Sequence, residues 1–163
     1  NVYYYKGEYT KALNDYDSSL MIREELKDKR GMGIILNNIG KVYTQTLEYN
    51  KAFKVLNNAI QIQGKIGVVE FESVVLFALI NKKLNGTYNK DEVNNFINKT
   101  EHIEDYLNYY LFLLLNEKSY IKRAFIQVRE KSKVMDNNLK NKFLDYPMPI
   151  AIIDQYNKKF KTK

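Results

Sequence analysis

The chain has 163 residues, of which 45% are hydrophobic and 28% charged, and this length and balance predict one soluble globular domain with a buried core. It contains no cysteine, which excludes disulfides, thiolate zinc sites and thiol catalysis, and no apolar run approaches the roughly 20 residues that span a bilayer. Its net charge of +7 arises in residues 117–163, with 12 basic and 5 acidic residues, because the 14 basic and 14 acidic residues of 1–116 cancel.

The chain begins without Met, so we expect it to be part of a longer protein. Residues 1–30 are polar and charged and carry no signal segment, so we expect the protein to be cytoplasmic. The stretch 3–27 aligns without gaps on the stretch 43–67. Identical residues then meet at Tyr3 and Tyr43, Glu8 and Glu48, Tyr9 and Tyr49, Lys11 and Lys51, and Ala12 and Ala52. These identities predict an internal repeat.

Residues 28–67 predict two antiparallel helices that break near Thr46–Glu48. In the first, Ile35, Leu36, Ile39, Val42 and Tyr43 recur at steps of three and four, as a buried helical face requires. Gly40 costs about 1 kcal/mol relative to Ala in a helix. We therefore expect another backbone to approach it, at the small residues Ala52 and Ala59 of the second helix.

The pattern Leu36, Ile39, Gly40, Tyr43, Ala52, Leu56 and Ala59 resembles the tetratricopeptide repeat (TPR), in the 40-residue variant of kinesin light chains and many bacterial signalling proteins. Residues 28–67 resemble it best, and residues 1–27 resemble a truncated repeat. The resemblance implies an all-α fold, an α-solenoid of antiparallel helix pairs that forms a right-handed superhelix.

Residues 68–101 and 102–136 match the repeat less well, and we interpret them as degenerate repeats in an array that covers 1–146. A helix over 90–100, with Asp91 as its N-cap, should bury Val93, Phe96 and Ile97. The segments "IEDYLNYYLFLLL" and "YIKRAFIQVREKSKVM" predict a further helix pair, with Ala124 near the position of a repeat alanine.

Residues 147–163 predict a C-terminal capping helix and a basic tail. Pro147 and Pro149 should end the preceding helix at about Asp145 or Tyr146, and Pro149 suits the first turn of the next. The expected apolar face of this helix consists of Ile150, Ile153, Tyr156 and Phe160. Solenoids need such a cap to cover the last exposed core.

No pattern in the chain predicts catalysis, a cofactor or a metal site. His102 is the only histidine, and nearby Glu101, Glu104 and Asp105 indicate a solvated helix start rather than a ligand set. Glycine-rich phosphate loops and nucleophile elbows are absent from the sequence. We therefore predict that the protein is not an enzyme.

The TPR resemblance implies a scaffold or regulatory segment of a larger, bacterial signalling protein that binds a peptide or helix in a concave groove lined by the first helix of each unit. The expected groove residues are Tyr4, Tyr5, Ile34, Asn37, Asn38, Lys41, Thr44, Phe77 and Asn81. Asn can bond a peptide backbone as donor and acceptor, and Lys41 can hold a carboxylate.

Two alternatives remain open. The basic C-terminal quarter could bind nucleic acid or another acidic partner, with Tyr120 or Phe125 stacking on bases beside Lys118, Lys122, Arg123, Arg129, Lys131, Lys133, Lys140 and Lys142. Self-association is the other, because a solenoid end left exposed by the truncated first repeat would present apolar residues.

Overall fold

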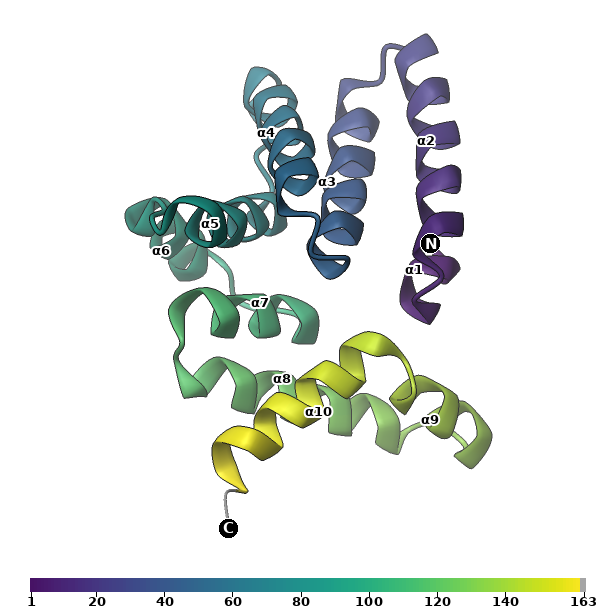
Figure 1. Ribbon diagram of the computed structural model, residues 1–163, viewed down its shortest axis with the longest axis vertical. Helices are drawn as coiled ribbons and strands as arrows, with labels where there is room; N and C mark the ends of the chain where they lie inside the picture. The colour runs from purple at the N-terminus through teal and green to yellow at the C-terminus, as the bar shows by residue number, and fades with distance from the viewer. Residues whose placement is uncertain (162–163) are drawn as a thin grey trace. The chain divides into compact units, whose positions relative to one another are not determined.

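The computed structural model describes residues 1–161, and all regular structure in that range is α-helical, with no strand (Figure 1). The all-α prediction is confirmed. In chain order the helices are α1 Val2–Lys6, α2 Tyr9–Glu25, α3 Lys29–Gln45, α4 Tyr49–Lys65, α5 Phe71–Asn85, α6 Lys90–Lys99, α7 Asp105–Leu115, α8 Lys118–Lys133, α9 Asn137–Leu144 and α10 Pro147–Phe160.

The chain divides into two compact units. The first holds residues 1–4 and 8–100, and the second holds residues 5–7 and the chain from Glu101 on. Each unit has its own core. Leu56, Leu76 and Ile80 are fully buried in the first unit, and Tyr110, Leu111 and Ile121 are among the most buried side chains of the second.

Helices α2, α3 and α4 are equal in length and evenly spaced along the chain, since each has 17 residues and they begin at Tyr9, Lys29 and Tyr49 (Figure 1). The turns before and after them repeat too, since the backbone is left-handed at Gly7, Lys27, Leu47 and Gly67. In each turn the next amide donates to a carbonyl five residues earlier, which is the Schellman pattern of helix ends; all four bonds measure 2.9 Å. The predicted break near Thr46–Glu48 is confirmed, because α3 ends at Gln45 and α4 begins at Tyr49.

Three of the sequence identities build the same contacts at the start of α2 and of α4. In the first copy, the Lys11 ammonium pairs with Glu8 and lies 5.4 Å from the centre of the Tyr3 ring. In the second, Lys51 pairs with Glu48 and lies 5.3 Å from the Tyr43 ring. We call each Tyr–Glu–Lys set a turn triad. The equal geometry shows that the repeat of the sequence is also a repeat of structure.

The small residues of the repeat lie in the core of the first unit, where Ala12, Ala52 and Ala59 are fully buried. The expected neighbour of Gly40 was wrong. A Cβ added at Gly40 would lie 2.4 Å from Cδ2 and 2.6 Å from Cγ of Leu56, a fully buried side chain of α4. Gly40 therefore makes room for a leucine side chain, rather than for the backbone beside Ala52 and Ala59.

After α4 the pattern becomes irregular. Helix α5 packs against α3, α4 and α6, and Gly86 ends it in the left-handed conformation. The predicted N-cap of α6 was wrong, because Asn89 and not Asp91 accepts a hydrogen bond, from the amide of Glu92. Val93 is fully buried, and the half-buried Phe96 stacks on Phe71 with ring centres 5.9 Å apart.

In the second unit, α10 packs against α7, α8 and α9. The prolines act as predicted, since α9 ends at Leu144 and α10 begins at Pro147. The predicted apolar face of α10 was partly wrong: Ile152 and Pro149 are buried, whereas Ile150 is 44% and Phe160 42% exposed.

An aromatic contact with α8 accounts for the rotation of α10 about its own axis. Tyr156 stacks on Phe125 of α8 with ring centres 3.8 Å apart and planes at 6°. Ile152 lies one turn before Tyr156 on the same side, so this contact brings Ile152 into the core and leaves Ile150 on another side of the helix.

Candidate functional site

Seven of the nine residues predicted to line a groove lie on α3 and α5, which pack directly against each other. Ile34, Asn37, Asn38, Lys41 and Thr44 belong to α3, and Phe77 and Asn81 belong to α5. Tyr4 and Tyr5 lie on α1 and fall in different compact units. The first unit therefore brings together the candidates of α3, α5 and Tyr4.

A polar cluster joins α3 to α5. The amide of Asn37 donates to one oxygen of Glu72 at 3.0 Å, and the Lys41 ammonium lies 3.0 Å from the other oxygen. Lys41 also lies 5.6 Å from the centre of the Tyr4 ring. Asn37 and Lys41 share one face because they are four residues apart on a helix, and Glu72 reaches them from the first turn of α5.

The cluster is largely shielded from water. Asn37 is 2% exposed, and the side chains of Lys41 and Glu72 are 14% and 17% exposed. A pair at this depth is screened less than a surface pair, and removing one partner leaves the other charge poorly solvated. Sequence reasoning missed Glu72. The signal available was an acidic residue in the first turn of the second helix after the Asn–Lys pair.

Burial changes the roles open to three predicted residues. Asn37 cannot present its amide to a peptide, although its Oδ1 is buried without a hydrogen-bond partner. Thr44 is also buried, and its hydroxyl donates to the carbonyl of Gly40 at 2.8 Å. A peptide carboxylate directed at Lys41 would have to displace Glu72.

The accessible candidates form a smaller set on α3 and α5. Ile34 is 39% exposed, and Asn38 one turn later is half-buried. On α5, Phe77 stacks on Phe53 with ring centres 5.4 Å apart, and Asn81 accepts a hydrogen bond from Asn85. Phe53 belongs to α4, so Phe77 lies on the side of α5 that faces α4. We use the name α3–α5 surface for Ile34, Asn38, Phe77 and Asn81, the accessible predicted residues of these two helices.

Phe77 and Asn81 also line a small cavity of about 60 Å³ in the first unit. Its other lining residues are Ile60, Val74, Ala78, Asn89 and Glu92. This space suits a water molecule or the tip of one side chain, and it is far below the several hundred Å³ of a typical small-molecule pocket.

The basic C-terminal quarter does not present the expected aromatic platform. Tyr120 is 7% exposed, and one face of Phe125 is covered by Tyr156. The prediction that Tyr120 stacks on a base was therefore wrong, because its ring is buried in packing. Phe125 is half-buried with one face covered, and its stacking on a base stays a prediction. The main contribution to binding an acidic partner would come from the lysine and arginine charges.

Part of that charge is also paired within the protein. Lys131 lies 3.1 Å from both Glu104 and Asp105, and Lys133 pairs with Glu130 at 2.7 Å. Burial opposes the charge of Lys131, but its hydrogen bonds to Asp105 and Glu104 outweigh burial and raise its pKa. The same contact, chiefly the hydrogen bond from Lys131, lowers the pKa of Glu104.

A metal cluster and a membrane-spanning helix are both absent from residues 1–161. No group of three or more His, Asp or Glu side chains in that range is arranged to hold a metal ion, and the His102 side chain is 70% exposed beside Glu104. Across the same residues, no helix combines the length and the apolar character needed to cross a membrane.

Comparison with family models, curated proteins and solved structures gave no match to this chain.

Proposed function

We propose that this chain is a non-catalytic protein-interaction module of the TPR type, and that its α3–α5 surface binds an extended peptide or a helix of a partner protein. It would act as a scaffold or regulatory segment of a larger, bacterial signalling protein in the cytoplasm. In this proposal residues 1–146 form the repeat array of a right-handed α-solenoid, and α10, which packs on α7, α8 and α9, is its cap.

The observation that carries the proposal is the structural repeat. Left-handed turns recur at even intervals, at Gly7, Lys27, Leu47 and Gly67, and the two turn triads have nearly equal geometry. Repeats of two helices that stack on their neighbours are the defining feature of helical repeat proteins, and such arrays serve mainly as binding surfaces.

The choice of surface follows from helix order. In a TPR array the first helices of successive units line the groove. The proposal assigns those positions to α3 and α5, and it is supported by the packing of these two helices against each other. Ile34 and Asn38 are accessible on α3 at a spacing of one helical turn. An apolar side chain followed by a carboxamide can supply both burial and backbone hydrogen bonds to a peptide.

The test is a peptide-display selection on the immobilised chain, followed by calorimetric titration of an enriched peptide. The double variant Ile34→Asp, Asn38→Ala should weaken binding about tenfold or more, because a charge replaces an apolar contact and a hydrogen-bonding group is lost. The matched control is Lys54→Ala, Asn58→Ala, which changes two exposed residues of α4.

Equal loss of affinity in the two double variants would contradict the proposal, as would a selection that enriches no peptide. Circular dichroism on both variants separates loss of binding from loss of folding, and all four substituted residues are at least partly exposed.

A further inference from the structure

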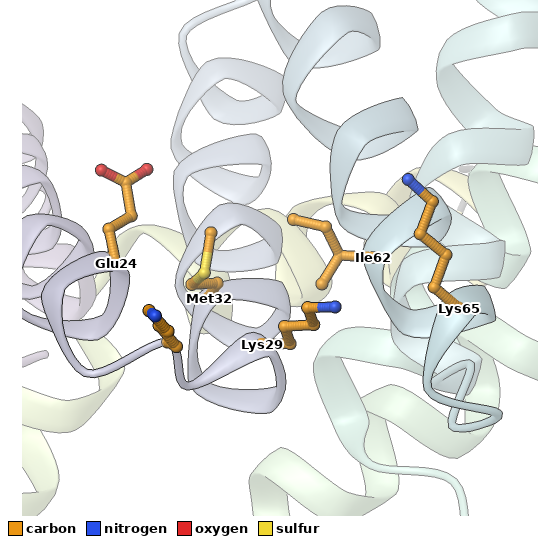
Figure 2. A pocket seen from close by; sticks show the side chains of 6 residues that line it. Glu24, Lys29, Met32, Ile62 and Lys65 are labelled. Carbon is orange, nitrogen blue, oxygen red and sulfur yellow. The ribbon is translucent and has the colours of Figure 1, made fainter.

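A second cavity in the first unit lies where α2 and α4 end and α3 begins, and its volume is about 430 Å³. Its lining residues are Glu24, Lys27, Lys29, Met32, Ile62 and Lys65. Figure 2 shows Met32 and Ile62 between Glu24 on one side and Lys65 on the other, with the Lys29 side chain running toward Ile62. None of these residues belongs to the α3–α5 surface.

The lining combines an apolar floor with a basic rim. Met32 and Ile62 are half-buried, whereas Lys27, Lys29 and Lys65 are exposed. Glu24 is the one carboxylate among the lining residues, against three ammonium groups. The charge around the cavity is therefore positive, and covering its apolar floor with an apolar group would be favourable because it removes apolar surface from water.

None of the three lysines has an ion-pair partner among the described residues, in contrast to three other lysines of the unit. Lys11, Lys41 and Lys51 pair with Glu8, Glu72 and Glu48. Around the cavity, the neighbouring acid Asp28 is engaged elsewhere: it accepts from Arg23 at 2.7 Å and from the amide of Gly31 at 2.9 Å. The positive charge of Lys27 and Lys29 is thus left without a local counter-charge from Asp28.

The fold holds two of these lysines in place. Lys27 is the left-handed residue of the turn between α2 and α3, with φ of 54°, and Lys29 is the first residue of α3. The turn itself is fixed by the hydrogen bond from the Asp28 amide to the carbonyl of Arg23. The side chains of Lys27 and Lys29 therefore extend from an ordered backbone, which lowers the entropic cost of bringing their ammonium groups to one ligand.

We propose that this cavity binds a small anionic amphiphile, a molecule with a carboxylate or phosphate group joined to a short apolar chain or ring. The anionic group would lie among Lys27, Lys29 and Lys65, and the apolar part would cover Met32 and Ile62. A volume of about 430 Å³ falls within the range of roughly 300–1,000 Å³ that small-molecule sites occupy. This site is additional to the peptide-binding function proposed above and does not depend on it.

The test is a calorimetric titration of the full chain with decanoate, decyl phosphate, decylamine and inorganic phosphate. Decanoate and decyl phosphate should bind with one site per chain. Decylamine should not bind, since its charge is repelled, and inorganic phosphate should bind at least about tenfold more weakly because it buries no apolar surface. If only decyl phosphate binds, the ligand is a phosphate ester, and if both bind equally, charge alone selects the head group.

The variant Lys27→Gln, Lys29→Gln, Lys65→Gln should weaken decanoate binding about fivefold or more, since each exposed ion pair contributes modestly. The matched control is Lys54→Gln, Lys83→Gln, Lys90→Gln, which removes the same charge from three exposed positions of the same unit that do not line the cavity. A third variant, Met32→Gln, tests the apolar floor of the cavity and should weaken decanoate binding while changing phosphate binding little.

Equal weakening by the two triple variants would overturn the proposal, because it would mean that net charge and not the cavity attracts the anion. Binding of decylamine as tight as that of decanoate, or binding of phosphate as tight, would overturn it too. Tighter binding of an acidic peptide containing Glu and Leu than of decanoate would reassign the cavity to a protein partner. The variant Ile34→Asp, Asn38→Ala should leave decanoate binding unchanged, so this site and the α3–α5 surface can fail separately.

Discussion

Residues 1–67 and residues 68–161 use different means to hold their helices in place. In the first stretch, turns of one kind recur at Gly7, Lys27, Leu47 and Gly67, and equivalent side chains make equivalent contacts. In the second, the connections do not follow this pattern. Asn116 is a left-handed residue that ends α7, whereas the segment before α7 is held by side chains of α7 and α8.

The connection before α7 is the clearest example in residues 68–161, and its centre is the carbonyl of Ile103. This carbonyl accepts from the amide groups of both Asn108 and Gln127, each at 2.7 Å, and Asn108 also donates to Gln127 at 3.0 Å. Asn108 is 1% exposed. A repeated turn is encoded within a few neighbouring residues, whereas this connection depends on Gln127, which belongs to a later helix. The difference explains why one stretch is readable as a repeat and the other is not.

The largest expected effect concerns the packing of the repeat at Gly40. Gly40→Ala should lower the free energy of unfolding by about 2–3 kcal/mol, because the new methyl would overlap the fully buried side chain of Leu56. Urea unfolding measures the change. Gly64→Ala is the control, since nothing lies within 4 Å of its added Cβ, and it should stabilise α4 by about 0.5 kcal/mol. Equal effects of the two substitutions would contradict the packing assigned to Gly40.

The next largest expected effect concerns the connection before α7, in residues 68–161. Asn108→Ala should cost about 2 kcal/mol, because it removes two hydrogen bonds and leaves Gln127 with one fewer partner in a buried setting. Hydrogen exchange should show faster exchange in residues 101–108, with α2 to α4 unchanged. Asn141→Ala, at an exposed position of α9, should have little effect. Unchanged exchange in residues 101–108 would show that the connection does not need this network.

Smaller effects on stability are expected at two turns of residues 1–67. Gly67→Ala should cost about 1 kcal/mol although its surroundings are open, because a Cβ is disfavoured at a φ of 72°. Leu47 has the same backbone conformation, with φ of 62°, and is 68% exposed. Leu47→Gly should therefore raise the free energy of unfolding by about 0.5 kcal/mol. Thermal unfolding measures both, and shifts of the same sign would contradict the equivalence of the turns.

The smallest effect is the pH dependence at Glu104 in the second stretch. The pKa of Glu104 is lowered in the folded protein, chiefly by the hydrogen bond from Lys131. Its contribution to stability is therefore present above the ordinary carboxyl pKa and is lost as the pH falls through the lowered value. Glu104→Gln should reduce stability at pH 6 by less than about 1 kcal/mol, because an exposed pair contributes little, and by progressively less as the pH falls through the lowered pKa of Glu104.

Unfolding at several pH values tests this sign. Glu101→Gln is the control, since Glu101 has no ion pair among the described residues. A difference between wild type and Glu104→Gln that grows as the pH falls would contradict the assigned direction.

The sequence predicted those parts of the fold that depend on local or repeated contacts. The helix break at residues 46–48, the helix start at Pro147 and the burial of Leu36, Ile39 and Val42 all follow from short-range patterns, and the structure confirms them. The neighbour of Gly40 and the buried side of α10 depend on which side chains of other helices pack against them. Those were not predictable from spacing alone.

The candidate site divides in the same way. Spacing placed Asn37 and Lys41 on one face of α3, but it could not show that Glu72 of α5 engages both of them. The cavity around Met32 and Ile62 was missed, because its lining comes from three separate helix ends that carry no shared motif. Whether Ile34, Asn38, Phe77 and Asn81 bind a peptide stays a prediction.

The most direct test of that prediction is chemical-shift mapping of a display-selected peptide on the isotope-labelled chain. The proposed function predicts the largest amide shift changes at Ile34 and Asn38 on α3 and at Phe77 and Asn81 on α5, with little change at Lys54 and Asn58. Largest changes on the exposed side of α4, or on α8 and α10, would contradict the assignment of the binding surface to α3 and α5.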